Sequence, residues 1–246
     1  MGLITLEDAR RMSDQGTRGP VVVRQGEVLT PGARDYLQEH RIQVVYPQGR
    51  ETGEGGHAAP AKYRTLFGAA LNEKPEHMTH LKENILVFKD HPRIAFRGWI
   101  DLLEAQTLLT QREAAQGGWP GLAEELGQVL EFVRRYIRFD VLGEKLENLT
   151  LCGMDAGQLR EYSHYPEKHF GQGHFLPAHT DPPALLAVNK LRCVVRQTEL
   201  AAYAAFRDAD GNVTRGDMIL GLNRLSSLMW IMMIKLKAGK YEHSPM

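Results

Sequence analysis

The chain has 246 residues, 43% of them hydrophobic and 24% charged, which is typical of a soluble globular protein with one large or two small domains. Lys plus Arg and Asp plus Glu number 30 each, so no net positive field would recruit nucleic acid or an acidic membrane. The amino-terminal residues lack a signal pattern, no apolar run reaches the roughly 18 residues that span a bilayer, and Cys152 and Cys193 offer no disulfide framework; we therefore expect a cytoplasmic protein.

Residues 1–47 predict a small α/β module. The segments VVVRQG (21–26), LTPGARDYLQEH (29–40) and RIQVVYP (41–47) indicate a strand, a helix and a strand. Thr30 before Pro31 is a helix N-cap followed by proline at the first helical position. A module of this size buries little surface alone, so we expect it to dock on another partner.

Residues 48–75 are interpreted as a linker or mobile loop, because their first part is rich in Gly, Pro and charge and has no periodicity. A third region, residues 76–246, is expected to be a helical domain in which strand signals nearly vanish. The predicted helices cover residues 93–115, 121–146, 155–165, 183–206 and 216–237. Asp155 is expected to cap the short third helix. The fold class is therefore mainly α, a five-helix bundle with a small amino-terminal β-α-β piece.

A row of polar side chains interrupts the apolar helix 183–206. Steps of three and four residues place them on one helical face. The row consists of Asn189, Arg192, Arg196, Glu199 and Tyr203. Guanidinium groups between apolar flanks are costly to bury, and their planar fork suits phosphate oxygens, so the row favours a phosphate-bearing ligand. The alternative is an internal Arg–Glu network with no ligand.

Two further polar rows lie on the helices 93–115 and 216–237. The first contains Arg93, Arg97, Asp101 and Glu104, and the second contains Asn223 and Ser227. We expect the three rows to line a single cleft with donors and acceptors. Hydrogen bonding between helices is the alternative for Asn223.

The histidine spacing and the missing glycine-rich loops indicate neither a metal site nor a standard nucleotide-binding loop. The histidines at positions 164, 169, 174 and 179 are five residues apart, which matches neither a helix face nor a strand face. Glycine-rich phosphate loops of the dinucleotide-binding or Walker type do not occur. We assign no metal-ligating residues.

Two segments in order carry a family resemblance. FLPAHTDPPALLAVNKLRCVVRQTE (175–199), followed by LNRLSSLMWIMM (222–233), resembles the cobalamin adenosyltransferases of the PduO and ethanolamine-utilisation type. Upstream, LVFKDHPRIAFRGWIDLLEA (86–105) resembles the family segment in which a lysine precedes a Gly-x-x-Asp helix. Matches to RFDVLGEKL (138–146) and to the amino-terminal LTPGARDYLQEHRI favour the ethanolamine branch, so the resemblance covers nearly the whole chain.

The chain also departs from this family. Gln197 replaces the second arginine of the better-known PduO proteins, and Ser227 replaces the aspartate after the Asn-Arg-Leu-Ser motif. The amino-terminal glycine-rich loop is missing. Residues 61–81 contain no cysteine where many ethanolamine-branch members carry a Cys-Cys-x-x-Cys metal motif. The resemblance therefore implies a member that does not need that transition metal.

The resemblance implies transfer of the 5′-deoxyadenosyl group of ATP to Co(I) cobalamin, which yields adenosylcobalamin for ethanolamine or diol utilisation. Arg192, Arg196 and Glu199 are the implied catalytic group, in which both arginines bind the polyphosphate with Mg²⁺ and Glu199 orients their guanidiniums. Phe139 is the expected wall against the corrinoid, with a plain core position as the alternative.

The remaining ATP-binding residues implied by the resemblance come from three segments. Lys89 would neutralise phosphate, Asn223 would hold the nucleotide or the bundle geometry, and Arg97 with Asp101 would form a supporting pair across the cleft. The implied partners are a cobalt reductase and further copies of the chain, in a trimer or dimer with the cleft between subunits. The implied location is the cytoplasm or the inside of a bacterial microcompartment.

Two other classes of function remain open at this point. The bundle could be a non-catalytic corrinoid or nucleotide carrier, or a microcompartment docking protein whose β-α-β piece is the adaptor. It could also be a helical nucleotide hydrolase, although no base positioned to activate water is evident in the sequence.

Overall fold

The computed structural model describes residues 2–14, 21–24, 27–40, 42, 44–45, 61–208 and 210–244. The chain divides into two compact units, residues 1–59 and 60–246. Residues 48–60, the first part of the predicted linker, lie outside the described residues.

The described part of the amino-terminal unit contains two pairs of parallel strands and two helices. Its elements are β1 (Gly2–Ile4), α1 (Leu6–Asp14), β2 (Val21–Val22), β3 (Glu27–Leu29), α2 (Pro31–Glu39) and β4 (Val44–Val45). The pairing of β2 with β4 on either side of α2 confirms the predicted strand–helix–strand order, and the Thr30 hydroxyl accepts from the Ala33 N–H as an N-cap does. The pair β1–β3 and the helix α1 were not predicted.

This unit has a small apolar core of its own. Both helices and three of the strands contribute to it. The core residues are Ile4, Ala9, Val21, Val23, Leu29, Ala33 and Leu37. Burial of these side chains stabilises the unit, because apolar area removed from water contributes roughly 25 cal/mol per Å².

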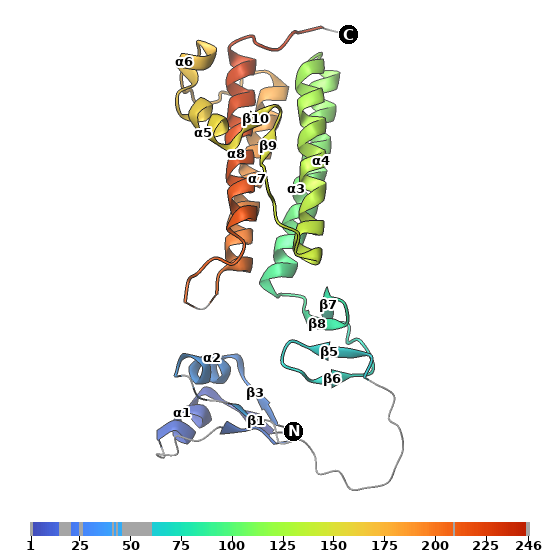
Figure 1. The fold of residues 1–246 in the computed structure, drawn as a ribbon, viewed down its shortest axis with the longest axis vertical. Helices are drawn as coiled ribbons and strands as arrows, with labels where there is room; N and C mark the ends of the chain where they lie inside the picture. Colours follow the sequence, from blue (N-terminus) through green and yellow to red (C-terminus); the bar gives the residue numbers. More distant parts are fainter. Residues whose placement is uncertain are drawn as a thin grey trace. The chain divides into compact units, whose positions relative to one another are not determined.

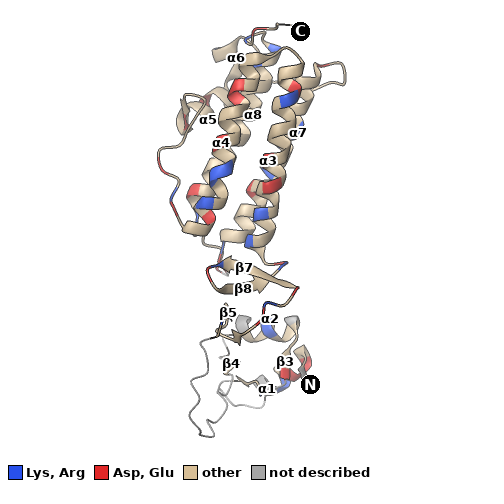
Figure 2. Ribbon diagram, turned by 90° about the vertical axis from the view of Figure 1, so that its right-hand side faces the viewer, with Lys and Arg blue, Asp and Glu red and all other residues tan. Residues whose placement is uncertain are grey.

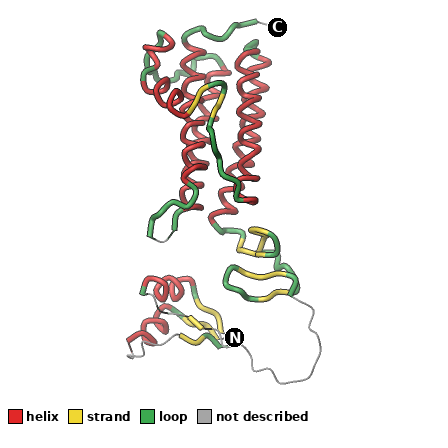
Figure 3. The backbone as a smooth tube through the Cα atoms, in the orientation of Figure 1, coloured by secondary structure: helices red, strands yellow, loops and turns green. Residues whose placement is uncertain are grey.

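A four-stranded sheet precedes the helices of the second unit (Figure 3). Its strands are β5 (Tyr63–Thr65), β6 (Ala70–Leu71), β7 (Met78–Lys82) and β8 (Ile85–Phe88), in the order β6-β5-β8-β7. This sheet corrects two expectations: residues 61–75 are not linker, and strands do not vanish after residue 76. Strands of two to five residues are too short to show a clear alternation of apolar and polar side chains.

Four long helices and several short elements form the rest of the second unit (Figure 1). They are α3 (Pro92–Gln116), α4 (Pro120–Leu142), β9 (Thr150–Leu151), β10 (Met154–Asp155), α5 (Ala156–His164), α6 (Pro166–Phe170), α7 (Pro183–Phe206) and α8 (Gly216–Lys237). The four long helices and the short helix α5 confirm the predicted bundle, and the short helix α6 was not predicted. The Asp155 side chain caps α5, as predicted. It forms a capping box with Gln158, which was not predicted. α4 ends four residues earlier than predicted because Gly143 adopts a left-handed φ of 70°.

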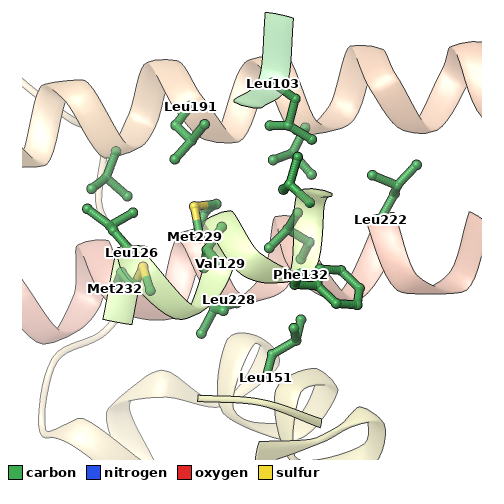
Figure 4. Packing of buried hydrophobic residues seen from close by; sticks show 14 of the residues in the cluster. Leu103, Leu126, Val129, Phe132, Leu151, Leu191, Leu222, Leu228, Met229 and Met232 are labelled. Carbon is green, nitrogen blue, oxygen red and sulfur yellow. The ribbon is translucent and has the colours of Figure 1, made fainter. Parts of the chain in front are cut away.

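The bundle core lies between α3, α4, α7 and α8 and includes Leu103, Val129, Leu191 and Met229 (Figure 4). α8 is long and apolar enough to cross a membrane by length and composition. Apart from Leu220, which is exposed, its leucines and methionines are nevertheless packed inside the bundle, many of them with no exposed surface. α8 is therefore a core helix of the bundle.

Candidate functional site

Arg192, the second member of the polar row on α7, lies beside α8. Its Cζ atom is 5.3 Å from the ring centroid of Trp230, a cation–π distance. The side chain is half-buried, and among the residues that the structure describes its buried Nε–H has no hydrogen-bond partner. Burial and the nearby charge of Arg196 both lower the pKa of Arg192, but an arginine remains charged at neutral pH.

Arg196 follows one turn later on α7 and is exposed. Within the described residues, neither Arg196 nor Arg192 has a carboxylate within ion-pair distance. The side chains of the row are therefore half-exposed or exposed, whereas we expected them to be buried. Among the described residues, no neighbouring acid neutralises the two arginines.

Glu199 makes a different contact from the one predicted. Its Oε1 accepts a hydrogen bond from Asn223 Nδ2 at 3.0 Å, and Asn223 Oδ1 accepts from Arg224 Nη1 at 2.8 Å. Glu199 thus links α7 to α8 through Asn223 and does not orient the guanidiniums of Arg192 or Arg196. The expectation that Asn223 holds bundle geometry by hydrogen bonding agrees with this contact.

Three aromatic side chains that were not predicted form a cluster, in which Trp230 is the member that contacts Arg192. The Trp230 ring stacks with His174 at 5.8 Å and 17°, and with Phe175 at 5.3 Å and 21°. Phe175 and Trp230 are half-buried, and the neighbouring Leu176 is 92% exposed. The sequence contains a signal for this cluster, since Phe175 opens the segment 175–199 and Trp230 lies in the segment 222–233. The five-residue spacing of the histidines gives no such signal for His174.

The polar row on α3 points elsewhere. Arg93 Nε donates to Asp140 Oδ1 at 2.8 Å, and Arg97 Nε donates to Asp140 Oδ2 at 2.7 Å. Arg97 also donates to the main-chain oxygens of His80 and Leu81. The predicted pairing of Arg97 with Asp101 is therefore wrong, because Arg97 contacts Asp140 of α4 and main-chain oxygens of β7 instead.

Asp101 lies on the α4 side of α3. Arg97, one turn before it, reaches Asp140 of α4, and Glu104, three residues after it, accepts from Arg134 of α4 at 2.8 Å. Asp101 itself is exposed and has no ion-pair partner among the described residues. The three rows therefore do not line one cleft. Charges of both signs are spread along α3 and α4 (Figure 2).

Lys89 and Phe139 also lie apart from Arg192. Lys89 Nζ pairs with Glu76 Oε1 at 3.0 Å, just before α3 begins. The rings of Phe96 and Phe206 meet at that end of the bundle, and Arg192 is about 21 Å along α7 from Phe206. Phe139 is 2% exposed and packs on Tyr136, so it occupies the core position that was the alternative to a corrinoid wall.

The chain is similar to several known proteins. A PduO-type ATP:corrinoid adenosyltransferase from Lactobacillus reuteri, solved with cobalamin and ATP, superposes with a TM-score of 0.46 at 14% identity, over 65% of this chain and 89% of that one. The corrinoid adenosyltransferase EutT of Salmonella typhimurium is 31% identical over 226 residues, covering 84% of this chain and 81% of the relative. The EutT protein of Escherichia coli K12 is 32% identical with the same coverage. The family model described as cobalamin adenosyltransferase matches residues 69–236. The chain belongs to the cobalamin adenosyltransferase family.

Proposed function

We propose that this protein transfers the 5′-deoxyadenosyl group of ATP to the Co(I) form of cobalamin. The electron pair of Co(I) attacks C5′ of ATP. A cobalt–carbon bond forms while the C5′–O bond breaks, and the bonding electrons leave with the triphosphate. The products are adenosylcobalamin and inorganic triphosphate.

The observation that carries this proposal is the pair of uncompensated guanidiniums on α7. Arg192 and Arg196 have no carboxylate partner in the described part of the chain, and the nearest acid of the row, Glu199, is engaged by Asn223. Two like charges one turn apart repel each other, and a polyanion between them removes that repulsion. Both forks would bind phosphate oxygens and stabilise the negative charge that develops on the leaving triphosphate.

Glu199 and Asn223 have a supporting role in this proposal. Their hydrogen bond joins α7 to α8 and holds the row in register. ATP enters with Mg²⁺, which neutralises part of the polyphosphate charge. A carboxylate is the ligand type that Mg²⁺ prefers, and Glu199 Oε2 has no partner among the described residues.

The aromatic residues beside Arg192 supply the apolar surface that the reaction requires. Phe139 is enclosed in the core, whereas Phe175 and Trp230 form a half-buried stack next to the guanidinium. A flat corrin or adenine ring packs well on such a surface, and the surface excludes water from the reacting atoms. We therefore place the wall against the organic rings at Phe175 and Trp230.

Association of several copies would complete the site. Lys89 and Arg192 lie at different levels of one bundle, so a second copy is the means by which Lys89 would reach the nucleotide. A trimer or dimer with the nucleotide between subunits fits this separation. A cobalt reductase would supply Co(I), and the enzyme would act in the cytoplasm or inside a microcompartment, for ethanolamine or diol utilisation.

The test is an assay in which the protein is mixed with ATP and chemically reduced cobalamin. The absorbance of the adenosylated product is recorded. We expect product with one triphosphate released for each cobalamin consumed. A change in the spectrum without turnover would identify a carrier instead. Phosphate release that does not depend on cobalamin would identify a hydrolase.

A further inference from the structure

The hydrogen bonds of His174 determine which of its ring nitrogens carries a proton. Trp230 Nε1 donates to His174 Nδ1 at 3.2 Å, and an indole nitrogen can only donate. The other ring nitrogen, Nε2, lies 3.3 Å from the main-chain oxygen of His164, which can only accept. His174 is therefore the neutral tautomer with its proton on Nε2.

This chain of bonds orients the indole ring of Trp230. The indole is tied at its nitrogen to His174, which is tied in turn to the end of α5. Phe175 stacks on the same ring system. The bond to His174 selects one rotation of the indole, because other side-chain torsions would leave the Trp230 N–H without this acceptor.

The oriented ring is the anchor of Arg192. The guanidinium carbon lies 5.3 Å from the ring centroid, while the guanidinium Nε has no hydrogen-bond partner. The ring face is the contact that the structure gives to this guanidinium within the described residues. A long side chain that already packs on a rigid ring has fewer rotamers to lose when it binds a ligand. Binding therefore costs less side-chain entropy.

We infer that His174 and Trp230 are positioning residues that hold the Arg192 guanidinium ready for the polyphosphate of ATP. The inference rests on the proposed function for its kinetic consequence, but the anchoring itself is a property of the protein alone. His174 acts through Trp230, and Trp230 acts through Arg192.

Steady-state kinetics of the full-length enzyme test the effect of this positioning on ATP binding. Trp230→Phe keeps the ring and removes the N–H, and His174→Leu removes the acceptor. Each change removes the hydrogen bond between Trp230 and His174, of about 1 kcal/mol, so we expect KM for ATP to rise about fivefold with kcat changed less than about twofold. The double variant should be no worse than His174→Leu alone, because that variant has already lost this bond.

Conservative and matched variants separate positioning from folding. His174→Asn retains an oxygen near the place of Nδ1 and should keep KM within about twofold of the native value. His179→Leu, in the same loop, and Trp119→Phe, whose ring stacks on His243 near the carboxyl terminus, are the controls and should leave KM unchanged.

An NMR measurement tests the anchoring without any activity. In protein labelled with ¹³C-arginine, the Trp230 ring current should shift the Arg192 side-chain resonances upfield, with Arg192→Lys providing the assignment. We expect His174→Leu and Trp230→Leu to abolish this shift, and His179→Leu to preserve it. An Arg192 resonance unchanged by His174→Leu, or a KM unchanged in active enzyme, would overturn the inference. A shift that depends on His174 in a protein without adenosyl transfer would instead reject the proposed function and leave the anchoring intact.

Discussion

Two pairs of arginines, each one helical turn apart, have opposite surroundings in this bundle. Arg93 and Arg97 on α3 share the carboxylate of Asp140, at 2.8 and 2.7 Å from their Nε atoms. Arg192 and Arg196 on α7 have no carboxylate partner within the described residues. The spacing within the two pairs is the same, so the difference comes from the side chains that the neighbouring helix places beside each pair. The first pair is neutralised inside the protein, and the second is free to neutralise a ligand.

Asp140 makes the α3 pair structural. Its side chain is completely enclosed, while those of Arg93 and Arg97 are 26% and 17% exposed. Arg93 also donates to the main-chain oxygen of Asp140, and Arg97 to those of two β7 residues. These bonds join α3, α4 and the sheet at one end of the bundle, which is a stabilising role.

Removal of the shared carboxylate should have the largest effect. Asp140→Ala leaves two partly buried guanidiniums without their counter-ion, so we expect the free energy of unfolding to fall by about 3 kcal/mol. Urea unfolding followed by circular dichroism at 222 nm measures it. Asp101→Ala is the control for stability, because this exposed aspartate has no ion-pair partner among the described residues; its expected change is below about 0.5 kcal/mol. Equal stabilities for the two variants would remove the structural role of the α3 pair.

Truncation on α7 should affect activity instead of stability. Arg196→Ala should lower adenosyl transfer by roughly 10²-fold or more, because the guanidinium would contact the charge that develops on the leaving triphosphate. The side chain is exposed, so the free energy of unfolding should change by less than about 0.5 kcal/mol. Native turnover by a correctly folded Arg196→Ala variant would exclude Arg196 from the site.

A charge-conserving change at Arg192 has a smaller predicted effect. Arg192→Lys keeps the positive charge but loses the planar fork that stacks on Trp230 and binds phosphate in a bidentate manner. We expect KM for ATP to rise about five- to tenfold, with kcat much less changed. Steady-state kinetics with ATP varied at saturating reduced cobalamin measures both constants. An unchanged KM would mean that charge alone matters at this position.

Metal removal should have the smallest effect. After treatment with a strong chelator, Mg²⁺ alone should restore full activity if the two arginines and Mg²⁺ suffice for the polyphosphate. The control is the same enzyme treated and assayed with Mg²⁺ and Zn²⁺ together. Activity that returns only with Zn²⁺ or Fe²⁺ would show that a transition metal is required after all.

Sequence periodicity was most reliable for the long helices. The limits of α7 and α8 agree with the predicted segments 183–206 and 216–237, because proline, glycine and the apolar repeat mark their ends. The sheet β5–β8 was missed, since its strands are short and their pairing joins residues that are distant in the sequence.

The candidate site was only partly predictable, for a related reason. Local spacing identified all three polar rows, but it could not show that Asp140 of α4 would neutralise the row on α3. It also could not show that Asn223 would engage Glu199. Partners that come from another helix depend on packing, and packing decides which polar row remains available to a ligand.

Binding of MgATP without cobalamin, measured by isothermal titration calorimetry, tests the central claim most directly. The Arg192→Ala/Arg196→Ala double variant should bind at least about 100-fold more weakly than the native protein, because two charge-assisted phosphate contacts are lost. Asp140→Ala, at a temperature where it is folded, should bind within about threefold of native, since the α3 pair takes no part in binding. Native affinity in the α7 double variant, with loss of binding in Asp140→Ala, would contradict the account.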